Sequence, residues 1–243
     1  MDKKIEKYET FITFTLIVIY LLSNSFCIQN FGSSSYQSAI CNLLLAFIIL
    51  IFILKNRLLS YYKLTTIPTP KKFLYFIPLL ILMTVNFWGG AQVNNSIKEI
   101  VFHILNMIGI GFLEEIIFRG FLFQMMAKDN IKSAIIVTSL TFGIGHIINL
   151  LNGAPLVETL LQVCYALAIG YLFAIILYKG NSLWPCIIAH IVTNATSIFT
   201  IKNSFTIYIC PILLIIISVS YAIYINKKIK SGDEKKWMTI TQF

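Results

Sequence analysis

Three ionisable residues, Glu114, Glu115 and Arg119, lie within a predominantly apolar run of the sequence between residues 100 and 126. A charged group at the centre of a spanning helix costs roughly 2.5–3.5 kcal/mol, so this grouping favours a functional site. On a helix, Glu115 and Arg119 are four residues apart and share a face, while Glu114 lies about 100° away. Glu115 can therefore neutralise Arg119 and leave Glu114 facing the interior of a helix bundle. A purely structural ion-pair network is the alternative interpretation.

Two further pairs of side chains occur in later apolar stretches, and the members of each pair are four residues apart. They are Phe142 with His146, and His190 with Asn194, so each pair shares one helix face. Counting residues from the expected span ends puts Glu114 and His146 within roughly 5 Å of the same membrane depth. We therefore expect Glu114, His146, His190 and Asn194 to line one cavity.

A carboxylate, two imidazoles and a carboxamide around a wet cavity suit the hydrolysis of an amide bond. Glu114 could act as the general base that takes a proton from water, and His146 could position that water or share its proton. His190 and Asn194 could donate hydrogen bonds to the oxyanion of the tetrahedral intermediate. These motifs contain no serine or cysteine with an evident base partner, so an activated water is the simpler nucleophile.

A zinc site is the competing use of Glu114, His146 and His190. Two histidines and one carboxylate form a known catalytic zinc ligand set that leaves a position open for water. However, the sequence lacks the His-Glu-x-x-His helix of many zinc proteases, and each candidate ligand lies on a different expected span. The sequence thus favours catalysis without a metal cofactor and keeps Zn²⁺ as the alternative.

The composition indicates an all-α, polytopic membrane helix bundle. The chain has 243 residues, of which 58% are hydrophobic and 12% charged, and its mean hydropathy is +0.82. Soluble domains are nearer about 25% charged, so we expect residues 1–243 to form a single integral membrane domain. The net charge of +9 is distributed between the apolar stretches, so we interpret it as a topology signal and expect no nucleic-acid partner.

Eight transmembrane helices with both termini cytoplasmic would leave 16 of the 19 basic residues on the inner side. Residues 96–106 are expected to form an interfacial helix or an outer extension of the fourth span, with His103 at the interface and without a catalytic role. Gly143 and Gly145 are expected to allow close approach of the fifth span to a neighbour. The expected spans are residues 11–28, 39–54, 73–90, 107–126, 131–150, 159–178, 183–201 and 205–225.

Together, the three motifs resemble the CPBP family of intramembrane proteases. This family includes the type II CAAX prenyl endopeptidases and bacterial Abi proteins linked to bacteriocin processing and self-immunity. The resemblance covers residues 109–200, which we expect to form a CPBP/Abi-like catalytic core. It is carried by Glu-Glu-x-x-x-Arg at Glu114, Glu115 and Arg119, by Phe-x-x-x-His at Phe142 and His146, and by His-x-x-x-Asn at His190 and Asn194.

The resemblance implies an eight-helix enzyme that cleaves a peptide bond within or beside the membrane. It implies that Glu114 is the water-activating base, that His146 assists it, and that His190 and Asn194 form the oxyanion site. By the same resemblance Glu115, Arg119 and Phe142 are supporting residues. The family has been described both as metalloproteases and as glutamate proteases, so it leaves the zinc alternative open.

The expected partners are membrane lipid and a membrane-associated or lipidated peptide or protein substrate. The Ile-, Lys- and Asn-rich composition resembles that of a low-GC Gram-positive bacterium, which favours its plasma membrane and a role in peptide or bacteriocin maturation or self-immunity. The alternative is a non-catalytic membrane scaffold that regulates a partner such as a sensor kinase or a toxin. A transporter or proton relay is a further alternative, because intramembrane Glu and His residues also serve there. The sequence leaves the oligomeric state open.

Overall fold

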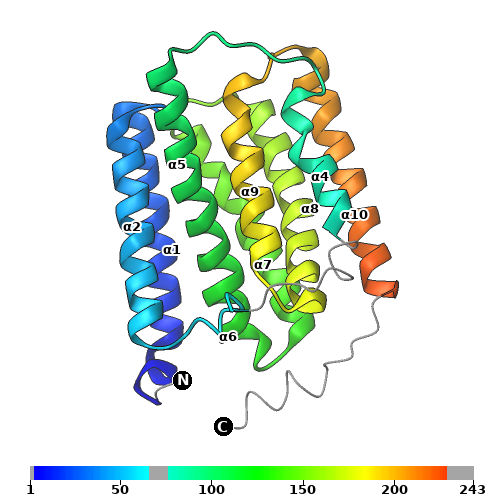
Figure 1. Ribbon diagram of the computed structural model, residues 1–243. Coiled ribbons are helices and arrows are strands. Elements are labelled where there is room, and N and C mark those ends of the chain that lie inside the picture. The colour runs from blue at the N-terminus through cyan, green and yellow to red at the C-terminus, as the bar shows by residue number, and fades with distance from the viewer. Residues whose placement is uncertain (1–2, 66–75, 229–243) are drawn as a thin grey trace.

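The computed structural model describes residues 3–65 and 76–228, and within these residues the protein is a bundle of helices (Figure 1). The α-helices run roughly side by side, with α1 and α2 on one side of the bundle and α10 on the opposite side (Figure 1). They are α1 (Lys3–Phe31), α2 (Tyr36–Lys55), α4 (Ile77–Met83), α5 (Ile97–Glu115), α6 (Phe123–Ala127), α7 (Ile131–Gly145), α8 (Leu156–Gly180), α9 (Trp184–Thr196) and α10 (Cys210–Lys228).

Among the described residues, six helical stretches are long and apolar enough to cross a membrane, which identifies the chain as an integral membrane protein. These stretches coincide with six of the eight expected spans. They confirm the prediction of an all-α membrane protein. The six stretches are Glu6–Phe31, Tyr36–Lys55, Ile97–Ala127, Ile131–Leu150, Leu156–Gly180 and Phe205–Lys228.

The two other expected spans are shorter helices in the part of the chain that the structure describes. The expected span at 183–201 is the apolar helix Trp184–Phe199, and that at 73–90 contains the seven-residue helix α4. Residues 73–75 lie outside the described residues, as do Lys71, Lys72, Lys230, Lys235 and Lys236, which contributed to the topology argument. The eight-span count and the cytoplasmic location of both termini therefore stay predictions.

One continuous helical stretch, Ile97–Ala127, carries the central charged motif. Its start at Ile97 is fixed by a capping box: the Glu99 backbone N–H donates to Ser96 Oγ (3.3 Å), and the Ser96 backbone N–H donates to the Glu99 carboxylate (2.8 Å). Of the two expectations for residues 96–106, the extension of the fourth span is therefore confirmed. Its location on the outer side of the membrane stays a prediction. Beyond Glu115 the helix widens into a seven-residue π-helical segment, Ile116–Leu122, a rare geometry that is frequent at functional sites.

Close helix contacts at glycines fix the neighbours of the site. A Cβ at Gly111 would lie 3.0 Å from the Ile191 backbone nitrogen, so α5 and α9 approach at this point. A Cβ at Gly143 would lie 2.9 Å from Leu167 Cβ, which brings α7 equally close to α8. Gly145 was also expected to allow close helix approach, and this expectation is wrong. A Cβ at Gly145 would lie 3.9 Å from Leu21 Cδ2, which is an ordinary van der Waals distance.

Candidate active site

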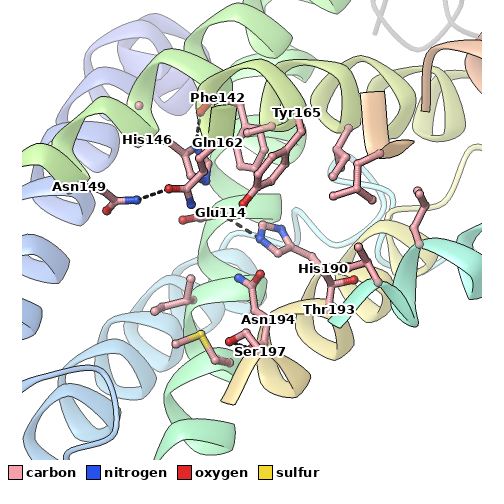
Figure 2. A pocket seen from close by; sticks show the side chains of 18 of the residues that line it. Glu114, Phe142, His146, Asn149, Gln162, Tyr165, His190, Thr193, Asn194 and Ser197 are labelled. Atoms are coloured by element: carbon pink, nitrogen blue, oxygen red, sulfur yellow. Dashed lines mark hydrogen bonds and ion pairs between the residues drawn. The ribbon is translucent and has the colours of Figure 1, made fainter. Parts of the chain in front are cut away.

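A cavity of about 380 Å³ lies between the helices and contains most of the side chains that the sequence singled out (Figure 2). Glu114 reaches it from α5, and Phe142 and His146 reach it from the end of α7. His190 and Asn194 reach it from α9, one helical turn apart. The expectation that these groups share one cavity is therefore correct. The volume falls in the range of small-molecule and peptide side-chain pockets.

The Glu114 carboxylate forms part of the cavity wall, and its side chain is 13% exposed. The Tyr20 hydroxyl of α1 donates a hydrogen bond to Glu114 Oε1 at 2.5 Å. Glu114 Oε2 lies 3.3 Å from His190 Nε2 and accepts no hydrogen bond of good geometry from the described residues. A buried polar atom without a partner usually marks a position for water or a ligand. This carboxylate therefore has one fixed oxygen and one with unmet hydrogen-bonding capacity.

His190 lies between the two carboxylates of the motif, Glu114 and Glu115. Figure 2 shows its contact with Glu114. Its Nδ1 is 2.8 Å from Glu115 Oε1, and its Nε2 faces Glu114 at the longer distance of 3.3 Å. The imidazole is buried, with 8% of the residue exposed. Only a protonated imidazole donates from both nitrogens, whereas a neutral one donates from one. His190 is therefore held firmly by Glu115 and only loosely by Glu114.

Glu115 and Arg119 form a fully buried ion pair behind the cavity, with 3.1 Å between Arg119 Nη1 and Glu115 Oε1. The guanidinium carbon lies 4.0 Å from the centroid of the Phe142 ring, a cation–π contact. Glu115 thus accepts from both Arg119 and His190. The four-residue spacing predicted this pair correctly, and it also predicted that Glu114 would be left facing the cavity.

His146 occupies the first position after α7, at the start of the short 3₁₀ segment His146–Leu150. Its Nδ1 is 2.9 Å from the Phe142 carbonyl oxygen. Because a carbonyl only accepts, Nδ1 carries the hydrogen, and in the neutral ring Nε2 is the acceptor. The His146 ring packs edge-on against Phe142 with 5.0 Å between centroids. His146 therefore offers one unprotonated nitrogen in its neutral form, held in a defined orientation.

Asn194 lies on the cavity wall next to His190 (Figure 2). Its backbone is supported by His103, for which no catalytic role was expected. His103 Nε2 is 3.2 Å from the Asn194 carbonyl oxygen and 3.2 Å from Ser197 Oγ. His103 belongs to α5, is 5% exposed and packs against α9, so it is buried within the bundle. Its expected depth at the membrane interface stays a prediction. The α5–α9 contact at Gly111 buries this face of α5.

Several cavity residues were missed from the sequence. Tyr20 and Asn24 come from α1, and Asn149, Gln162 and Tyr165 come from the segments around α7 and α8. The Asn149 carboxamide donates to Gln162 Oε1 at 2.9 Å, which fixes one polar wall (Figure 2). Asn24 and Gln162 could have been found as polar side chains inside apolar stretches. Tyr20 gave no such signal, because tyrosine is common in membrane helices.

The zinc alternative is tested by the grouping of possible ligands. Across residues 3–65 and 76–228, no three His, Cys, Asp or Glu side chains are grouped closely enough to hold a metal ion. The 3.3 Å between Glu114 Oε2 and His190 Nε2 would suit two neighbouring zinc ligands, but His146 is not grouped with them. In this conformation the candidate ligand set is therefore incomplete.

Comparison with known proteins gives one family. A model described as type II CAAX prenyl endopeptidase Rce1-like matches residues 96–196, and no curated protein matches the chain significantly. The matched segment runs from the N-cap of α5 to the end of α9, and it contains Glu114, His146, His190 and Asn194. Tyr20 lies outside it, on α1.

Proposed function

We propose that the protein, through its Rce1-like type II CAAX prenyl endopeptidase domain at residues 96–196, is an intramembrane protease that hydrolyses its substrate with water activated by Glu114. The observation that carries this proposal is the Glu114 carboxylate at the cavity wall, held through Oε1 and unsatisfied at Oε2. A general base must be fixed and must have a free lone pair for the proton that it takes. Glu114 has both properties.

His146 assists Glu114 by holding the attacking water. Its Nδ1–H is committed to the Phe142 carbonyl, which leaves Nε2 of the neutral ring to accept a hydrogen bond from water on the cavity side. A water bound to two acceptors directs a lone pair away from both of them, toward a substrate carbonyl. This division of roles makes Glu114 the proton acceptor and His146 the orienting group.

Asn194 and His190 stabilise the oxyanion of the tetrahedral intermediate. The Asn194 carboxamide supplies N–H donors on the cavity wall beside His190. The 3.3 Å contact between His190 Nε2 and Glu114 is longer than the usual 2.7–2.9 Å of a charge-assisted bond. A developing oxyanion can therefore replace Glu114 as the partner of Nε2, while Glu115 holds the ring through Nδ1 at 2.8 Å.

The substrate is a membrane-associated peptide or protein, with or without a lipid, whose cleaved segment is uncharged. Besides Glu114 and the two histidines, the cavity-lining residues in the described part of the chain are apolar or neutral polar. Burying an unpaired charge against such a wall costs several kcal/mol. A bacterial plasma membrane and peptide or bacteriocin maturation or self-immunity fit this substrate class and the chain's composition.

The test is cleavage of a panel of membrane-associated peptides by the purified protein in nanodiscs, with and without a strong chelator. The panel pairs each neutral peptide with a copy that carries Lys or Asp beside the scissile bond. The proposal expects cleavage of the neutral peptides in the presence of chelator, and at least about tenfold slower cleavage of the charged copies. Loss of activity on chelation with recovery on adding Zn²⁺ would instead assign Glu114 and the histidines as metal ligands. Folded protein that cuts no peptide would favour a non-catalytic scaffold.

A further inference from the structure

Tyr20 contacts the proposed base although it lies outside the matched segment, 94 residues from Glu114 in the sequence. Its hydroxyl donates to Glu114 Oε1 at 2.5 Å, and the residue is 1% exposed. The same face of α1 also contributes Leu21, Asn24 and Ile28 to the cavity wall. Helix α1 is therefore part of the site and not a peripheral neighbour.

Side chains near both ends of α1 fix the helix and therefore the height of Tyr20. Near its start, buried Glu9 pairs with Lys128 at the end of α6 and accepts a hydrogen bond from Tyr61 at 2.7 Å. Burial, followed by the contact with Glu9, raises the pKa of Tyr61 above its ordinary value, so its hydroxyl stays protonated and remains a donor. Toward its other end, Ser25 Oγ donates to Asn152 Oδ1 at 2.7 Å. Movement of α1 along its axis would break contacts on both sides of Tyr20.

Fixing Oε1 has a chemical consequence for the carboxylate of Glu114. A carboxylate on a flexible glutamate side chain can rotate, so its basic oxygen has no fixed direction. The Tyr20 hydrogen bond occupies Oε1 and restricts that rotation, which leaves Oε2 as the oxygen with unmet capacity. A buried tyrosine could donate to any nearby acceptor, but this acceptor is the one carboxylate that lines the cavity among the described residues.

We propose that Tyr20 is a positioning residue for Glu114, and that the catalytic unit consists of the matched segment together with α1. This inference rests on the proposed function of Glu114. It makes two statements beyond that function: the Tyr20 hydroxyl is needed for the chemical step, and residues 96–196 alone lack part of the site.

The test uses Tyr20→Phe in the full-length protein in nanodiscs, with Tyr221→Phe as the matched control. Tyr221 is a buried tyrosine of α10 whose hydroxyl has no hydrogen-bond partner among the described residues, and it does not line the cavity. Both changes remove one buried hydroxyl and keep the ring. We expect Tyr20→Phe to lower kcat about ten- to a hundredfold, since it loses a hydrogen bond to a charged group. We expect KM to stay within about twofold, because Tyr20 acts on Glu114 and not on substrate binding, and Tyr221→Phe to keep the parental kcat.

Incorporation of 3-fluorotyrosine at position 20 is the second arm, because it restores an O–H donor on the same ring. The proposal expects most of the lost kcat to return. It is overturned if Tyr20→Phe keeps the parental kcat, if Tyr221→Phe loses as much, or if the fluorotyrosine protein is as slow as Tyr20→Phe.

Glu114→Gln, assayed in parallel, separates the proposal for Tyr20 from the proposed function of Glu114. An inactive Glu114→Gln beside a fully active Tyr20→Phe refutes only the role of Tyr20, whereas an active Glu114→Gln refutes the proposed function itself.

Discussion

Replacing Arg119 by methionine should strongly destabilise the protein, because it leaves the buried Glu115 carboxylate without its cation. Both side chains of the pair are 0% exposed and the paired atoms are 3.1 Å apart. Removing one partner of such a pair typically costs about 3–5 kcal/mol. Loss of the guanidinium from its position 4.0 Å over the Phe142 ring adds up to about 2 kcal/mol. At about 2–4 °C per kcal/mol for a chain of this size, Tm should fall by at least roughly 6 °C.

The assay is thermal unfolding in one detergent for the parent, Arg119→Met and the double variant Glu115→Gln/Arg119→Met. The double variant removes both charges, and its amide oxygen can still accept the bond from His190 Nδ1, now 2.8 Å from Glu115 Oε1. Removing both charges avoids leaving one of them buried without a partner, which is the main cost of the single variant. The double variant should therefore regain most of the Tm lost by Arg119→Met. A single variant as stable as the parent, or a double variant less stable than the single, would refute the assignment of Glu115 and Arg119 as a charged pair.

Two further changes test the packing and the oxyanion site. Gly143→Ala should destabilise the protein by about 1–3 kcal/mol, because the new Cβ would lie 2.9 Å from Leu167 Cβ, whereas Gly145→Ala should cause no loss because its nearest neighbour is at 3.9 Å. Thermal unfolding of both variants checks this, and equal Tm values would contradict the α7–α8 contact. Asn194→Ala should lower kcat by about 10²–10³ with little change in Tm, as for the loss of one oxyanion donor. Steady-state cleavage of a neutral peptide measures it, and an unchanged kcat would remove Asn194 from the site.

Local spacing predicted the parts of the site that depend on one helix. Glu115 and Arg119 are four residues apart, and the structure pairs them because i and i+4 side chains share a face. Of the eight spans that the apolar stretches predicted, six are membrane-length helices in the described residues, since length and hydropathy are local properties. Depth counting predicted that Glu114 and His146 would line one cavity, and both line it.

Contacts between distant helices could not be predicted in the same way. The role of Tyr20 depends on how α1 is rotated and shifted relative to α5, and the apolar sequence of α1 contains no signal for either. The burial of His103 was not predicted because it depends on the close approach of α5 to α9, which occurs at Gly111 and the facing Ile191. The π-helical segment after Glu115 also changes the helical register, so a count based on 3.6 residues per turn fails beyond it.

The most direct test of the account is kcat for Glu114→Gln, measured in nanodiscs with chelator present on a peptide that the parent cleaves. Glutamine keeps the size of the side chain and an oxygen that can accept from Tyr20, so the fold should be retained with a Tm close to that of the parent. We expect a loss in kcat of about a thousandfold, because the amide cannot take the proton from water. A folded Glu114→Gln protein with kcat within about tenfold of the parent would contradict the claim that Glu114 activates the water.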